Sequence, residues 1–171
     1  MDLLERISDY LKQHKLTMAT AESCTAGLIV SELASVPGSG QSIDCGLAVY
    51  SPEAKNRYLA VSFETIDTYG LTSEATVHEM VVGALNNNNA NMALANTGIA
   101  GPESHDGIPV GTVCFAWAFR HQQQVYIITE TRQFSGDRNQ VRLAAAHHAL
   151  ALIPSHHGEM LAGNVPRANE A

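Results

Sequence analysis

Ser23 lies in the segment A-E-S-C-T-A-G, residues 21–27, between a short alternating pattern at 16–21 and an apolar helical pattern that begins near residue 27. The first N–H groups of a helix lack intrahelical acceptors and lie at the positive end of its dipole. A serine at such a place can be a nucleophile beside an oxyanion site, and the backbone there can bind a phosphate. The alternative is that Ser23 or Thr25 caps the helix, since caps are commoner than nucleophiles.

Lys55 follows a second strand pattern, in the segment Y-S-P-E-A-K at 50–55. Ser51 and Pro52 are typical of the N-cap and first position of a helix, so Lys55 falls in its first turn. Burial and the helix dipole both disfavour an ammonium there and lower its pKa. A neutral lysine beside a serine can activate the hydroxyl, with Tyr50 nearby. A solvated surface lysine is the alternative interpretation.

Thr97 and Gly98 lie in N-T-G-I-A-G-P, residues 96–102, where a strand runs into a glycine-rich turn. Such a turn lets backbone amides approach a ligand closely, although a tight connection without any ligand is equally compatible with the pattern. Arg138 and Arg142 are four residues apart, so both project from one face of the last long helix. A pair of arginines at a helix start suits a phosphate or carboxylate ligand, and salt bridges within the chain are the alternative.

The histidines and cysteines indicate neither a metal site nor a disulfide framework. The pairs at 147–148 and 156–157 lack the H-E-x-x-H spacing of a zinc site. The three cysteines, Cys24, Cys45 and Cys114, are an odd number without a C-x-x-C pair, which favours a reducing compartment. We therefore expect no metal and no other cofactor.

The composition excludes several partner classes. The 171 residues carry a net charge of −7, which disfavours a broad nucleic-acid surface. The charged segment 1–16 does not resemble a signal peptide, and no apolar run reaches the ~18 residues of a membrane span. The prediction is a soluble cytoplasmic protein with no nucleic-acid or membrane partner. A homodimer or higher homo-oligomer is expected, because small cytoplasmic enzymes often associate symmetrically.

Helical and strand patterns alternate along the chain. Apolar spacing predicts helices over 3–11, 27–35, 51 onward, 73–85 and 135–152, and strands over 16–21, 45–50, 92–97, 112–119 and 125–131. Such interleaving is typical of a sheet covered on both faces. The sequence predicts an α/β fold with a single domain over 1–153 and a flexible tail over 154–171.

Five motifs, in this order, resemble the CinA C-terminal domain family. They are T-A-E-S-C-T-A-G at 20–27, A-V-Y-S-P-E-A-K at 48–55, T-G-I-A-G-P at 97–102, P-V-G-T-V at 109–113 and F-S-G-D-R at 134–138. The resemblance spans about residues 5–150 and is to the stand-alone form, without the extra N-terminal domain of larger CinA proteins. It implies a three-layer α/β/α sandwich with a mixed sheet.

The resemblance also implies a chemistry: hydrolysis of the carboxamide of nicotinamide mononucleotide to nicotinic acid mononucleotide and ammonia, without a metal. By the matching motifs, Ser23 would be the nucleophile and Lys55 the base, with Tyr50 as a helper. Thr25, Thr97 and Gly98 would contact the nucleotide. Arg138 or Arg142 would hold its phosphate.

Two departures from the family pattern favour a protein with altered or lost deamidase activity. Ala26 replaces the first glycine of the family's T-G-G, and its methyl would crowd the backbone or oppose a positive φ. Residues 103–107, E-S-H-D-G, replace a glycine pair and bring carboxylates toward an anionic phosphate. The alternative is a degenerate paralogue that binds a nucleotide or a protein partner with little or no deamidase activity.

Overall fold

The computed structural model describes residues 1–169. Its centre is a five-stranded sheet in the order β2-β1-β3-β4-β5. The strands are β1 (Met18–Glu22), β2 (Ile43–Ala48), β3 (Met92–Gly98), β4 (Thr112–His121) and β5 (Gln124–Gln133). β2, β1 and β3 run parallel to one another, whereas β4 and β5 are antiparallel to their neighbours. The carboxyl ends of the three parallel strands therefore meet at one edge of the sheet.

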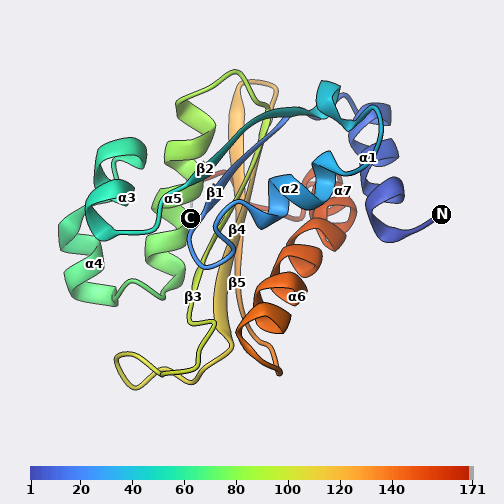
Figure 1. Cartoon of the computed structure of the whole chain (residues 1–171). Coiled ribbons are helices and arrows are strands. Elements are labelled where there is room, and N and C mark those ends of the chain that lie inside the picture. The colour runs from blue at the N-terminus through green and yellow to red at the C-terminus, as the bar shows by residue number, and fades with distance from the viewer. Residues whose placement is uncertain (170–171) are drawn as a thin grey trace.

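Helices cover both faces of this sheet (Figure 1). One face carries α1 (Leu3–Gln13), α2 (Leu28–Ala34), α6 (Arg138–Ala151) and α7 (Ile153–Leu161), and the other carries α3 (Pro52–Leu59), α4 (Phe63–Tyr69) and α5 (Glu74–Asn86). A short 3₁₀ turn, η1 (Ser39–Ser42), precedes β2. The predicted three-layer α/β/α arrangement with a mixed sheet is confirmed.

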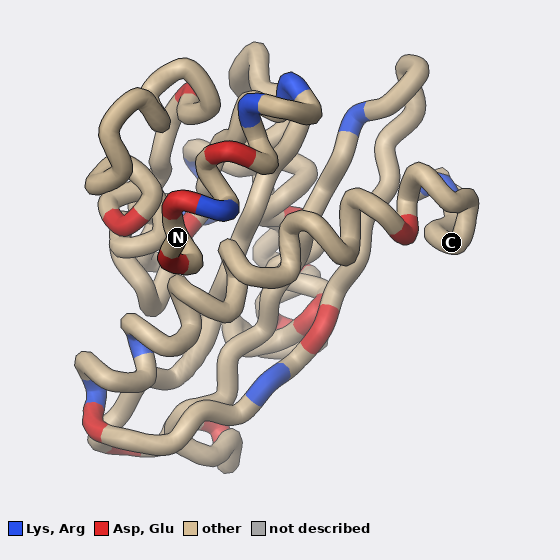
Figure 2. The backbone as a smooth tube through the Cα atoms, turned by 90° about the vertical axis from the view of Figure 1, so that its right-hand side faces the viewer, with Lys and Arg blue, Asp and Glu red and all other residues tan. Residues whose placement is uncertain are grey.

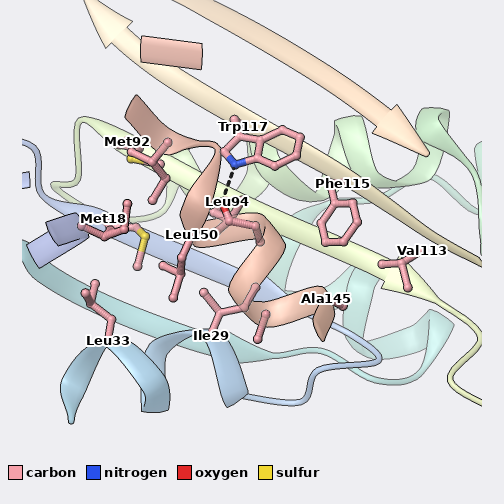
Figure 3. Close-up of a cluster of buried hydrophobic side chains, with 14 of the residues drawn as sticks. Met18, Ile29, Leu33, Met92, Leu94, Val113, Phe115, Trp117, Ala145 and Leu150 are labelled. Carbon is pink, nitrogen blue, oxygen red and sulfur yellow. Dashed lines mark hydrogen bonds between the residues drawn. The ribbon is translucent and has the colours of Figure 1, made fainter. Parts of the chain in front are cut away.

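The two faces of the sheet are packed differently. Large side chains such as Phe115 and Trp117 point toward α6, where the Trp117 indole donates a 2.9 Å hydrogen bond to the carbonyl of Ala149 (Figure 3). Alanines such as Ala95 and Ala116 point toward α5. Small side chains on that face let α5 lie close to the sheet, and β4 is buried almost along its whole length.

Charge is spread thinly over the surface. Figure 2 shows basic and acidic residues interspersed over the elements seen from that side. No helix within residues 1–169 is long and apolar enough to cross a membrane.

Two short helices differ from the sequence prediction. α4 was not expected, and Ser62 caps it by accepting from the N–H of Glu64. The flexible tail was predicted to start at 154, but α7 occupies residues 153–161 and buries Ile153 and Met160. Residues one helical turn or two apart on α7 share a face, which is why this short segment packs on the sheet.

The connection from β1 to α2 contains a left-handed residue that is not glycine. Ala26 has φ +50° and Gly27 has φ +95°. A side chain in this region costs roughly 1 to 2 kcal/mol per residue, because Cβ approaches the carbonyl oxygen. Ala26 is exposed, so nothing in the packing compensates this strain.

We predict that Ala26→Gly raises the free energy of unfolding by about 0.5 to 1 kcal/mol, with a melting temperature about 1 to 4 °C higher. Gly27→Ala is the matched control: its added Cβ meets nothing within 4 Å, so the strain at positive φ acts alone and lowers stability by about 1 kcal/mol. Thermal denaturation followed by circular dichroism measures both changes. A melting temperature for Ala26→Gly at or below that of the wild type contradicts the prediction.

Candidate functional site

The site lies where Ser23 and Lys55 meet. Ser23 directly follows β1, and Lys55 is on α3, which follows the neighbouring parallel strand β2. The two strands end at the same edge, so residues just beyond them lie close together. The Nζ of Lys55 is 2.8 Å from the Oγ of Ser23.

The amine of Lys55 is enclosed. The residue is 1% exposed, and its Nζ also donates to the carbonyls of Val49 and Tyr50, both at 2.9 Å. Burial disfavours the ammonium and lowers the pKa of Lys55 to about 8. A neutral amine keeps two N–H bonds, which match the two carbonyls, and its lone pair then faces the Ser23 hydroxyl. This geometry suits a base that takes the serine proton.

Glu22 occupies the start of α2. Its buried carboxylate accepts from the backbone N–H groups of Gly27, Ile29 and Val30 at 2.9 to 3.1 Å. The prediction that helix-start amides lie free beside Ser23 is therefore wrong. A carboxylate without water requires several donors, and the first turn of α2 supplies them.

The turn after Ser23 has other donors. The Ser23 N–H is bound to the carbonyl of Asn96, and the Ser23 carbonyl accepts from the N–H of Ala26, each at 3.1 Å. In the described part of the chain, the N–H of Cys24 donates to no backbone carbonyl. Cys24 lines the same cavity as Ser23, so its N–H is a candidate donor to a developing oxyanion.

A cavity of about 230 Å³ opens on the pair. Six of the eight predicted site residues line it: Ser23, Tyr50, Lys55, Thr97, Gly98 and Arg138. Its wall also includes Leu71 and Thr72 from the loop between α4 and α5. The carbonyl of Leu71 accepts a 2.9 Å hydrogen bond from the hydroxyl of Thr97. Leu71 and Thr72 carry no motif that would have pointed to them.

Thr25 and Arg142 are the two predicted residues that do not line this cavity. Thr25 is fully buried, donates to Glu22 at 2.6 Å and accepts from the side chain of Asn96 at 2.7 Å. Arg142 donates to the carbonyls of Cys24 and Thr25, both at 3.0 Å. Both side chains thus hold the turn that carries Ser23.

Arg138 and Tyr50 form the outer wall. Arg138 donates to the Tyr50 hydroxyl at 2.9 Å and to the carbonyl of Gly101. The contact brings the end of β2 and the start of α6 together at the mouth of the cavity. The phenol of Tyr50 therefore lies with Arg138, whereas only its backbone carbonyl contacts Lys55.

The loop at 103–107 reaches the cavity, as its sequence predicts. Glu103, His105 and Asp106 all line it. Ala26 does not, so its methyl does not crowd this space. Within residues 1–169, no three His, Cys, Asp or Glu side chains gather in a way that could hold a metal ion.

A family model described as the CinA C-terminal domain matches residues 1–156. The chain belongs to this family. It is 40% identical to the nicotinamide-nucleotide amidohydrolase PncC of Escherichia coli strain K12, over 90% of this chain and 92% of that protein. A protein of the same name from Enterobacter agglomerans is 41% identical over 87% of this chain and 90% of its own length.

Relatives of the family differ in length. This chain is 40% identical to a CinA-like protein of Chlorobium phaeobacteroides but spans only 37% of it. Among solved structures, a competence damage-inducible protein A from Klebsiella pneumoniae matches with a TM-score of 0.83 and 37% identity, over 90% of this chain and 93% of that one. A competence/damage inducible protein from Agrobacterium tumefaciens matches with a TM-score of 0.81, 37% identity and coverage of 90% and 92%.

We predict that Lys55 titrates near pH 8 in the folded protein, because its amine is buried. The chain has three lysines, Lys12, Lys15 and Lys55, so their Cε and Nζ signals can be followed separately by NMR. Lys55→Arg assigns the signal by removing it. In denaturant the same lysine should titrate near ~10.4. A folded-state pKa above ~10 would contradict the enclosed geometry.

Proposed function

We propose that this protein hydrolyses the carboxamide of nicotinamide mononucleotide to nicotinic acid mononucleotide and ammonia, with Ser23 as nucleophile and Lys55 as base. The observation that carries the proposal is the 2.8 Å contact between the buried Lys55 amine and the Ser23 hydroxyl, beside a cavity. The substrate is inferred from the relatives named nicotinamide-nucleotide amidohydrolase.

The first half of the reaction forms an ester. Neutral Lys55 takes the Ser23 proton while the serine oxygen bonds to the carboxamide carbon, and the π electron pair moves onto the carboxamide oxygen. The N–H of Cys24 donates to this oxyanion. When the pair returns, the C–N bond breaks, and the Lys55 ammonium gives its proton to the leaving nitrogen. Ammonia departs and Ser23 carries the acyl group.

The second half releases the acid. A water molecule bonds to the ester carbon as Lys55 takes one of its protons, and the same N–H receives the oxyanion. The bond between the carbon and the Ser23 oxygen then breaks, and Lys55 returns the proton to that oxygen. The enzyme is restored, and the product leaves as a carboxylic acid, which loses its remaining proton to water and becomes a carboxylate.

The remaining predicted residues take part in two ways. Arg138, held by Tyr50, offers its charge to the nucleotide phosphate, while Thr97 and Gly98 form the wall beside the reacting carboxamide. Thr25 does not contact the substrate; its hydroxyl binds Glu22 and so helps to hold the turn that carries Ser23. The proposal includes a cytoplasmic homo-oligomer, as the composition and size predict.

A second candidate function is that of a degenerate paralogue, which binds a different nucleotide or a protein partner and has little or no deamidase activity on nicotinamide mononucleotide. It is favoured by Glu103 and Asp106, whose carboxylates line the cavity that the phosphate would enter. Like charges a few ångströms apart repel, so these residues weaken binding of a phosphomonoester. In that case the Ser23–Lys55 pair persists as a structural contact.

We predict that the purified protein releases ammonia from nicotinamide mononucleotide and that Ser23→Ala abolishes this release. Lys55→Met should lower kcat at least ~100-fold, since a general base usually contributes that much. The wild-type kcat/KM should rise about tenfold per pH unit up to about pH 8 and then level off, because the neutral amine is the active form.

Circular dichroism controls for the fold of both variants. Ammonia release that survives in Ser23→Ala would show that another group is the nucleophile. No release from the wild type, together with a melting temperature raised by the nucleotide, would establish binding without turnover.

We predict that the double variant Glu103→Gln, Asp106→Asn lowers KM for nicotinamide mononucleotide about three- to tenfold and leaves kcat within twofold. Removing two carboxylates removes repulsion on the order of 1 kcal/mol, and each 1.4 kcal/mol is tenfold. Ser104→Ala, on the same loop but without a charge, is the matched control. Added salt should shrink the difference between the double variant and the wild type. An unchanged or raised KM would show that the two carboxylates do not oppose the substrate.

A further inference from the structure

The two arginines of α6 lie four residues apart but serve different places. Arg138 lines the cavity and contacts Tyr50 there. Arg142 reaches behind the Ser23 turn: its Nε donates to the Cys24 carbonyl and its Nη2 to the Thr25 carbonyl, both at 3.0 Å. Its Nη1 is 3.3 Å from the side-chain oxygen of Asn139. A shared helix face therefore does not mean a shared ligand.

Every carbonyl of residues 23–25 accepts a hydrogen bond from within the chain. The Ser23 carbonyl accepts from the N–H of Ala26, and the next two accept from Arg142. The N–H groups of Cys24 and Thr25, by contrast, donate to no backbone carbonyl among residues 1–169, and of these two residues only Cys24 lines the cavity. A backbone N–H at a cavity wall, next to carbonyls that are bound elsewhere, attracts negative charge.

The charge of Arg142 is also directed at this turn. Its guanidinium forms no ion pair with any carboxylate of the described residues, and two of its three hydrogen bonds go to the turn's carbonyls. A carbonyl that binds a cation polarises its peptide, which makes the N–H of that peptide a stronger donor. The two carbonyls that Arg142 binds share their peptides with the N–H groups of Thr25 and Ala26, which do not line the cavity, so the contribution of Arg142 to the Cys24 N–H is to hold the turn in place.

We infer that Arg142 is a positioning residue: it fixes the Ser23 turn so that the N–H of Cys24 receives the oxyanion, while Arg138 binds the substrate. The inference rests on the proposed serine chemistry. It assigns Arg142 to stabilisation of the transition state rather than to the phosphate. Its loss should then lower kcat and leave KM nearly unchanged.

The test compares Arg142→Met with Arg138→Met, which remove the same group four residues apart. For Arg142→Met we expect kcat to fall about 10- to 100-fold, below the ~100- to 1000-fold typical of losing an oxyanion donor outright, with KM within about threefold. Arg138→Met should raise KM at least about tenfold. Arg142→Lys, which can reach one carbonyl, should recover part of the lost kcat.

Two further readouts separate positioning from loss of fold. The pH profile of Arg142→Met should keep its apparent pKa near 8, because Lys55 is untouched. The rate at which a fluorophosphonate labels Ser23 should fall in parallel with kcat, since the serine oxygen displaces fluoride from phosphorus while the phosphonyl oxygen takes the place of the carboxamide oxyanion. Should Arg142→Met not fold, Arg142→Lys carries the test by the same comparison of kcat with KM.

The outcomes distinguish this inference from the proposed function. A wild type that neither releases ammonia nor reacts with the fluorophosphonate overturns the serine chemistry itself. An active wild type whose Arg142 variants keep kcat but show a raised KM overturns only the inference and makes Arg142 a substrate ligand. A lowered kcat with an unchanged labelling rate also overturns it, because the defect then lies in a step after attack.

Discussion

The contact between the buried Lys55 amine and the Ser23 hydroxyl depends on the whole architecture around it. It requires two neighbouring parallel strands to end together, so that the serine after β1 and the helix after β2 meet. It also requires carbonyls to receive the remaining N–H bonds, since an unpaired amine without water is costly. Val49 and Tyr50 supply them from the segment that links β2 to α3. One short chain segment thus both places Lys55 on its helix and provides acceptors for the N–H groups of its amine.

A second constraint decides where an oxyanion can be received. Glu22 lies beside Ser23 in sequence but points to the other side, into the start of α2, where its carboxylate also accepts from the hydroxyls of Thr20 and Thr25. Because this buried charge takes up the helix amides, they are not available to a ligand. An anion at this site would therefore be bound by the N–H groups of the turn before α2 and not by those of the helix itself. The carbonyls of this turn need donors as well, and Arg142 provides two N–H groups.

The sequence predicted the sheet and the Ser23–Lys55 pair, but not the partners that complete the site. The sequence carries the information on local structure: the alternation of the strands, the Ser51-Pro52 helix start and the ordered motifs can all be read from a single chain. Whether Glu22 turns toward its helix, and whether two arginines on one helix face share a target, depends on contacts between elements far apart in the chain. Arg142 and Cys24 are 118 residues apart. The same holds for Leu71 and Thr72, which reach the cavity only because α5 packs on the sheet.

The degree of burial at Lys55 fits a base that works near neutral pH. With a pKa of about 8, about a tenth of the amine is neutral at pH 7. Deeper desolvation would raise that fraction at most about tenfold, but each lowering of the pKa also makes the amine a weaker acceptor of the serine proton. The carbonyls of Val49 and Tyr50 accept two N–H groups of the amine and so direct its remaining position toward the Ser23 hydroxyl. The depth of burial sets how much of the amine is neutral, and the two carbonyls set where that neutral amine points; a base near Ser23 needs both.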